Sequence, residues 1–230
     1  MKNKQVVFSI VFPVMNQEDH IERIIRAYHN ELSKYGFSFE LIAVVNGTTD
    51  NSFNVCRKVA SLLPNVYAYE LEDSGYGLGI IHGFKKACGK YYCYLNCART
   101  YPDELVACLK YFLVNPNVII HGVRKKRDIR LRAITSVVFN TTCKLLTGIS
   151  SSDINGIPKV LSKQTYEKLN LKYKDSMIDL ELLHKSRLNN IAVIEVPIYK
   201  NVRHGGQSTS NFSTSFRLLK ELVIYHLKRW

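Results

Sequence analysis

Short apolar runs alternate with amphipathic segments along the first half of this chain, and the alternation limits the folds open to it. Four runs have the composition of β-strands, over residues 6–12, 39–45, 66–71 and 91–95, and the first of them has that of a strand buried on both faces. The segments between them carry apolar residues at helical spacing, as at Ile21, Ile24 and Tyr28. Strands that alternate with helices through right-handed crossovers build a parallel sheet. We therefore predict an α/β fold, with a mostly parallel central sheet and helices on both faces.

Composition narrows the class of protein. A chain of 230 residues with 46% apolar residues fits one domain with a sizeable core. Its apolar runs are too short to span a bilayer, and the polar segment Met1–Gln5 lacks signal-peptide character. The six cysteines have no C-x-x-C spacing, which is typical of reduced thiols in a cytoplasmic protein. The formal net charge of +13 predicts an anionic partner such as nucleotide phosphate or phospholipid, and no nucleic-acid recognition module is visible.

A polar triplet ends the fourth strand. In the stretch K-Y-Y-C-Y-L-N-C-A-R-T-Y-P-D-E-L, residues 90–105, an aromatic and apolar strand leads into Asn96, Cys97 and Ala98. A Pro turn and an amphipathic helix follow. Because ligands bind beyond the carboxyl ends of parallel strands, we expect residues 96–100 to face the active cleft.

Several short motifs follow one another along nearly the whole chain: S-I-V-F-P-V-M-N-Q-E, V-V-N-G-T-T-D-N-S, G-Y-G-L-G-I-I-H-G-F-K-K-A-C-G, H-G-V-R, S-D-I-N-G, D-L-E-L, E-V-P and R-H-G-G-Q-S. Their content and order resemble the family 2 glycosyltransferases with the GT-A (Rossmann-like) fold, above all the dolichol- and polyprenyl-phosphate sugar transferases. Each motif alone is weak evidence, but the ordered set predicts the fold. The resemblance implies a nucleotide-diphosphate sugar as donor and a polyprenyl phosphate, or another membrane-surface molecule, as acceptor.

The resemblance assigns the strand-end loops of the first half to the nucleotide. The residues it places there are Pro13, Met15, Asn16, Gln17, Glu18, Asn46, Asp50, Asn96, Cys97 and Ala98. The loop at Asn46 has a simpler alternative, an Asn-Gly turn in which Asp50 caps the next helix. Arg124, Arg203 and Ser208 are assigned to phosphate, since guanidinium groups suit bidentate phosphate contacts.

Asp153 is the leading candidate for a catalytic base. An inverting transfer needs a carboxylate that removes the acceptor's proton, opposite the leaving nucleotide. Asp179 and Glu181, on the next predicted helix, are acidic alternatives. The other interpretation of Asp153 is a turn or helix-capping carboxylate.

The triplet departs from the pattern of the family it resembles. There it is normally D-x-D, whose carboxylates hold Mg²⁺ or Mn²⁺ against the nucleotide diphosphate, whereas Asn96 and Ala98 stand at those positions here. Gln17 and Asn46 likewise replace acidic residues. We therefore predict no metal ligands in the triplet. Three outcomes stay open: Arg and Lys replace the metal, substrate phosphates hold it, or catalysis is lost. The last would make the chain a pseudo-glycosyltransferase that binds a partner or ligand without turnover.

A basic run, R-K-K-R-D-I-R-L-R, divides the chain. We expect one domain over residues 1–210, with a nucleotide-binding half to about 120, an acceptor half over 121–210, and an amphipathic helix over 211–230. In that helix, one apolar stripe lies beside a basic face; it consists of Phe212, Phe216, Leu219, Val223, Leu227 and Trp230. This pattern predicts a peripheral helix on the inner, cytoplasmic face of an anionic membrane. The alternatives are packing on the protein's own sheet or in a homodimer.

Overall fold

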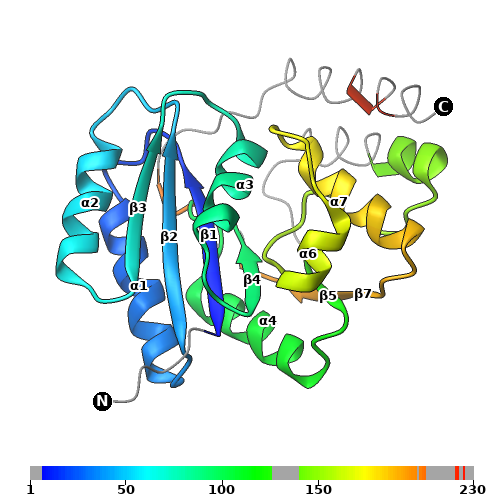
Figure 1. Cartoon of the computed structure of the whole chain (residues 1–230), viewed down its shortest axis with the longest axis horizontal. Helices are drawn as coiled ribbons and strands as arrows, with labels where there is room; N and C mark the ends of the chain where they lie inside the picture. The colour runs from blue at the N-terminus through cyan, green and yellow to red at the C-terminus, as the bar shows by residue number, and fades with distance from the viewer. Residues whose placement is uncertain (1–6, 126–139, 201, 206–220, 223–224, 226–230) are drawn as a thin grey trace.

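A seven-stranded sheet forms the centre of the computed structural model, which describes residues 7–125, 140–200, 202–205, 221–222 and 225. The strand order is β3-β2-β1-β4-β6-β5-β7. Figure 1 shows β3, β2, β1 and β4 side by side. β6 runs antiparallel to β4 and β5, and the other neighbours pair in parallel. In chain order the strands are β1 (Phe8–Val14), β2 (Phe39–Asn46), β3 (Val66–Leu71), β4 (Tyr91–Tyr94), β5 (Ile119–Arg124), β6 (Lys159–Ser162) and β7 (Val193–Ile198).

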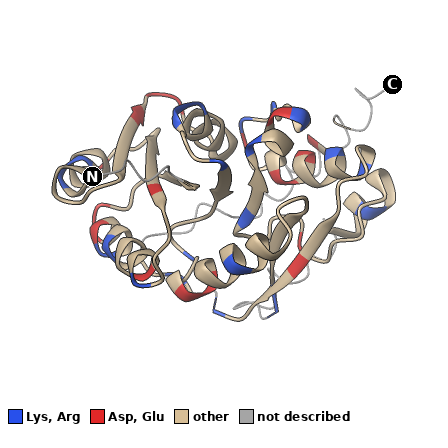
Figure 2. Ribbon diagram, turned by 60° about the horizontal axis from the view of Figure 1, so that its bottom comes forward, with Lys and Arg blue, Asp and Glu red and all other residues tan. Residues whose placement is uncertain are grey.

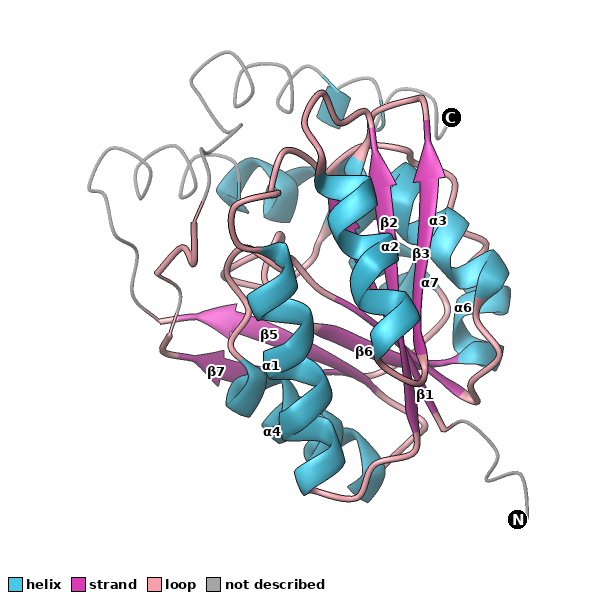
Figure 3. Ribbon diagram, turned by 90° about the vertical axis from the view of Figure 1, so that its left-hand side faces the viewer, coloured by secondary structure: helices cyan, strands magenta, loops and turns pink. Residues whose placement is uncertain are grey.

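Helices cover both faces of the sheet (Figure 3). α1, α2 and α4 contribute buried residues to one apolar cluster, and α3, α6 and α7 contribute to the other. Their bounds are α1 (Ile21–Lys34), α2 (Ser52–Leu62), α3 (Tyr76–Lys86), α4 (Pro102–Val114), α6 (Lys163–Leu169) and α7 (Met177–Leu188). None of the helices in the described part of the chain is long and apolar enough to cross a membrane.

The period of two along β1 explains why its sequence is apolar throughout. Ile10 and Phe12 point to the first cluster, whereas Val11 between them belongs to the second. All three side chains are fully buried. A strand covered by helices on both faces has no solvent side, so every position favours an apolar residue.

The strands that the sequence predicts for residues 1–120 are largely confirmed. β3 spans residues 66–71 as predicted, and β1 ends at Val14 rather than Phe12 because it stays in register with β2 through Val45. Five of the six cysteines are buried and all are free thiols, but Cys88 is exposed, which the sequence did not indicate. Of the predicted 211–230 helix, the structure describes residues 221–222 and 225, which are helical. The rest of that helix and most of the basic run lie outside the described residues.

Candidate functional site

Two strand-end loops of the first half are joined by hydrogen bonds. After β1, the Asn16 side-chain oxygen accepts from the Thr48 hydroxyl and from Thr49 N, both at 2.9 Å. Glu18 N donates to Asp50 at 3.0 Å. Partial burial opposes the charge of Asp50, but hydrogen bonds from Ser52, Thr48 and Glu18 lower its pKa. The structure thus brings these predicted nucleotide residues together at the carboxyl edge of β1 and β2.

Asn46 ends β2 and connects it to the glycine-rich start of α3. Its side-chain nitrogen donates to Gly75 O at 2.8 Å. An aspartate could not make this bond, because an ionised carboxylate only accepts. Two residues on, a Cβ at Gly77 would lie 2.3 Å from Tyr173 O, so glycine is required for the chain to pass there. Asn46 therefore stabilises the loop arrangement, whatever it contributes to a ligand.

The triplet after β4 is packed into the protein. The Asn96 side-chain oxygen accepts from Ala98 N at 3.0 Å, and the side chains of Cys97 and Ala98 are buried. The Cys97 thiol lies 3.1 Å from the Gln17 side-chain oxygen, and burial raises its pKa to about 12. From the far end of the chain, His204 N donates to Ala98 O at 2.8 Å. The triplet thus contacts both the loop after β1 and residues 203–205.

Buried charges mark the second half. Lys, Arg, Asp and Glu lie mainly on helices and loops around the sheet (Figure 2). Among the described residues, five of these charged side chains are buried, and four belong to the second half: Glu40, Asp153, Lys159, Asp179 and Glu181. Burying a charge without a partner is costly, so the contacts of each one indicate its role.

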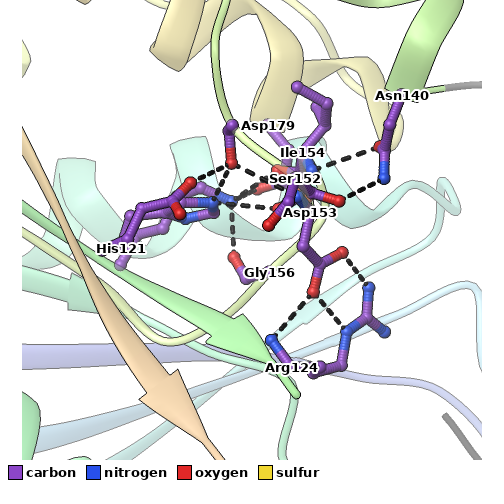
Figure 4. Close-up of polar contacts among 11 residues, drawn as sticks. His121, Arg124, Asn140, Ser152, Asp153, Ile154, Gly156 and Asp179 are labelled. Atoms are coloured by element: carbon purple, nitrogen blue, oxygen red, sulfur yellow. Dashed lines mark hydrogen bonds and ion pairs between the residues drawn. The ribbon is translucent and has the colours of Figure 1, made fainter. Parts of the chain in front are cut away.

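Asp153 and Arg124 form a bidentate pair (Figure 4). The Arg124 Nε and Nη2 atoms donate to the two carboxylate oxygens at 2.7 and 2.6 Å, and Arg124 N adds a bond of 3.1 Å. Burial opposes the charge of Arg124, but the hydrogen bonds and charge of Asp153 raise its pKa. The predicted base and a predicted phosphate ligand therefore contact each other, and the guanidinium occupies both oxygens of Asp153.

Asp179, in the first turn of α7, is held through one oxygen. Lys159 Nζ and the Tyr94 hydroxyl both donate to Oδ1, at 2.6 and 2.8 Å. Lys159 has no exposed surface, and its ammonium also donates to Gly156 O at 2.7 Å and Ile154 O at 3.2 Å. Burial lowers the pKa of Lys159, and Asp179 opposes that shift. In the described part of the chain, no hydrogen bond reaches the second oxygen of Asp179.

Glu181 holds the loop before α7 in place. Its oxygens accept from Lys172 N and Tyr173 N at 2.8 and 2.9 Å, and from Lys185 Nζ at 2.6 Å. These bonds hold the segment that crosses the start of α3, where Lys174 O accepts from Leu78 N at 2.8 Å. Among the three acidic candidates, Asp179 is the one with an oxygen left for a ligand.

Sequence reasoning missed Lys159, Tyr94 and His121 in this network. His121 Nε2 lies 2.9 Å from Asp153 O, and burial, with a smaller effect of Lys159, lowers the pKa of its imidazole to about 3. The available signal was the placement of a lysine at the start of an apolar run, K-V-L, where a solvated charge is not expected.

Four more site residues are predicted from the sequence, and the structure describes three of them. Arg203 Nε donates to Gly205 O at 2.6 Å. The next residue, His204, contacts the triplet through its backbone nitrogen. Pro13 O accepts a long contact of 3.5 Å from the Cys97 thiol. Met15 is partly exposed beside these loops. Ser208 lies outside the described residues.

Comparison with known proteins identifies the family of this chain. The sequence profile of glycosyl transferase family 2 matches residues 9–169. The chain is 23% identical to a dolichol-phosphate mannosyltransferase of Pyrococcus furiosus, covering 96% of this chain and 64% of that protein. It is 23% identical to an undecaprenyl-phosphate 4-deoxy-4-formamido-L-arabinose transferase of Pseudomonas fluorescens, covering 94% and 63%. The chain thus spans less than two thirds of the length of both relatives.

Solved structures show the same fold. Glucosyl-3-phosphoglycerate synthase of Mycobacterium tuberculosis superposes with a TM-score of 0.73 at 14% identity, over 97% of this chain and 80% of that one. Its complex with Mn²⁺, uridine-diphosphate and phosphoglyceric acid gives a TM-score of 0.71 at 14% identity, over 96% and 78%. The predicted GT-A fold is confirmed.

Proposed function

The chain belongs to glycosyl transferase family 2, and from this premise we propose that it transfers a sugar from a nucleotide-diphosphate sugar to a polyprenyl phosphate or another membrane-surface acceptor. Both named relatives are transferases acting on polyprenyl phosphates. The observation that carries the proposal is the convergence of three strand-end loops with a buried ion network at one edge of the sheet. Ligands of open α/β sheets bind at this edge.

The first half binds the donor nucleotide in this proposal. Residues 13–18, 46–50 and 96–98 surround the carboxyl ends of β1, β2 and β4, and the hydrogen bonds among them fix their positions in advance. A pocket whose polar groups are already oriented loses less freedom on binding. The donor's base and ribose would contact the loops, and its diphosphate would face the triplet.

The second half supplies the acceptor side. Asp153 positions the Arg124 guanidinium at the end of β5, where it can contact an anionic group. Asp179, anchored through Oδ1, presents its other oxygen. With a hydroxyl acceptor this carboxylate would take the proton as the sugar–oxygen bond forms and the nucleotide diphosphate departs. A phosphate acceptor is already anionic near pH 7 and needs no such transfer.

Membrane association at the cytoplasmic face belongs to the same proposal. The net charge of +13 favours an anionic surface. The six residues of the predicted apolar stripe lie outside the described residues. Nearby, Leu222 is buried, and the Tyr225 hydroxyl lies 2.7 Å from His184 Nδ1 on α7. Flotation of the full chain with anionic liposomes at low and high salt measures the association, and a chain that never floats would point to packing or self-association.

Turnover is the decisive experiment. Purified full chain is first screened by thermal shift against uridine and guanosine diphosphates, and the binding nucleotide then selects radiolabelled sugar donors. Incubation with membrane extracts should move label into the lipid fraction. If no nucleotide diphosphate binds, the donor assignment is wrong. Binding without any transfer would favour the scaffold alternative, which gains no support from relatives that are themselves named as transferases.

A further inference from the structure

The triplet after β4 lacks the donors that a divalent cation needs. Mg²⁺ and Mn²⁺ take hard oxygen ligands, above all carboxylates. Here the Asn96 oxygen accepts from Ala98 N, the Cys97 thiol lies against the Gln17 oxygen, and Ala98 offers only a methyl group. Because burial raises the pKa of Cys97 to about 12, its sulfur stays a neutral thiol at physiological pH. The residues at this position therefore do not fit the metal that the fold family implies.

The nearby carboxylates are already used in holding loops together. Asp50 accepts from Glu18 N at 3.0 Å, and Glu18 accepts from Asn51 N at 2.8 Å. The described residues contain no group of three or more His, Cys, Asp or Glu that could hold a metal ion. In the rest of the sequence, Asp128 is the one carboxylate and His226 the one histidine. The chain is thus poor in the ligands from which a replacement metal site could be built.

A cation from the protein itself lies beside the triplet. The bond from His204 N to Ala98 O, 2.8 Å long, places residues 203–205 on this loop. The Arg203 guanidinium is oriented by a bond of 2.6 Å from its Nε to Gly205 O. It is close enough to Cys97 for its charge to lower the pKa of that thiol, against the larger effect of burial. A permanent positive charge is therefore fixed at the end of β4.

Resting on the transferase function above, we propose that this chain binds the diphosphate of its donor without a divalent metal, with the Arg203 guanidinium supplying the positive charge at the triplet. A guanidinium is always charged and matches two phosphate oxygens at once. The neutral side chains of Gln17, Asn46 and Asn96 fit this arrangement, because no carboxylate there has to be offset by a dication.

Isothermal titration of the full chain tests the proposal without requiring turnover. Uridine and guanosine diphosphates are titrated into protein stripped with EDTA and into protein with added Mn²⁺ or Mg²⁺. The dissociation constants with and without metal should agree within about threefold. Arg203→Ala should weaken binding in EDTA by about tenfold or more, since a charge-assisted phosphate contact is lost. Arg203→Lys, which keeps charge but not the bidentate geometry, should fall between.

Two further variants keep the result interpretable. Arg57→Ala removes an equal charge from the exposed surface of α2 and should leave the dissociation constant unchanged. Asn96→Asp with Ala98→Asp should create metal-dependent binding that the natural chain lacks. Metal that tightens binding to the natural chain by more than about tenfold overturns the inference and leaves the transferase function standing. Absence of binding under every condition overturns both.

Discussion

The two halves of this protein satisfy their buried polar groups by different means. In the first half, hydrogen bonds of amides, hydroxyls and the carboxylates of Glu18 and Asp50 connect the strand-end loops, as in the bonds of Asn16 to Thr48 and of Asn46 to Gly75. In the second, full charges are buried in pairs, Arg124 with Asp153 and Lys159 with Asp179. Neutral hydrogen bonds depend little on pH, whereas a buried ion pair fails when either partner is lost. The halves should therefore respond differently to mutation and to acid.

Replacing Asp179 with Asn should have the largest effect, provided that the acceptor is a hydroxyl. Asn keeps the shape but cannot take a proton, so kcat/KM should fall by about 10²–10⁴-fold. With a phosphate acceptor the loss should be under about tenfold, since no proton has to move. Steady-state rates with both kinds of acceptor distinguish these cases. A greater loss in Asp153→Asn than in Asp179→Asn would return the base to Asp153, the residue that the sequence favoured.

Removing the buried lysine should destabilise the second half strongly. Lys159→Met leaves Asp179 buried without its cation, at an expected cost of about 3–5 kcal/mol in the free energy of unfolding. Urea denaturation measures this change. Adding Asp179→Leu should restore part of the loss, because no buried charge then remains. Lys163→Met, on the exposed start of α6, is the matched control and should stay within about 0.5 kcal/mol. A double variant less stable than Lys159→Met would contradict the pairing.

Acid should weaken the second half before the first. Burial lowers the pKa of His121 from 6.5 to about 3, so the folded chain keeps it neutral while the unfolded chain binds a proton. Its contribution is present above pH 6.5 and is lost as pH falls towards 3, reaching on the order of 5 kcal/mol. The pKa of Asp50 is also lowered, but from 3.8, so the stability that its carboxylate contributes is lost only as pH falls below about that value.

Denaturation at a series of pH values tests this order. His121→Gln keeps a donor in place of Nε2 but cannot titrate, so the slope of stability between pH 6.5 and 4 should flatten. An unchanged slope would show that other groups control the acid response.

The smallest of these effects is expected in the first half, where the Asn46 side chain is the donor in its hydrogen bond to Gly75 O. Asn46→Asp replaces a donor to Gly75 O with a carboxylate that only accepts, so the melting midpoint at pH 7 should fall, by about 1–3 kcal/mol in stability. Asn16→Asp is the matched control, because Asn16 uses its oxygen as an acceptor. Equal losses in the two variants would mean that added charge, rather than the lost donor, is responsible.

The architecture and the family could be predicted from the sequence. Apolar runs separated by helical periods specify strands covered on both faces, and the turn residues that follow them specify strand-end loops. These are local properties of a few neighbouring residues, which explains why β3 and the strand end at Asn46 were predicted to within a residue. Because β1 pairs in parallel with β2 and β4, the loops that follow these strands lie at one edge of the sheet.

The contacts between charged residues could not be predicted and are seen only in the folded chain. Tyr94 and Asp179 are 85 positions apart, yet the Tyr94 hydroxyl donates to Asp179. Lys159 joins them because β6 pairs antiparallel to β4, which sets Lys159 opposite Tyr94. The sequence favoured Asp153 as the base, but the structure places both of its oxygens against Arg124. Likewise, His204 N meets Ala98 O although the two residues lie far apart in the sequence. The strength of an ion pair depends on the separation and burial of its atoms, which spacing along the chain does not encode.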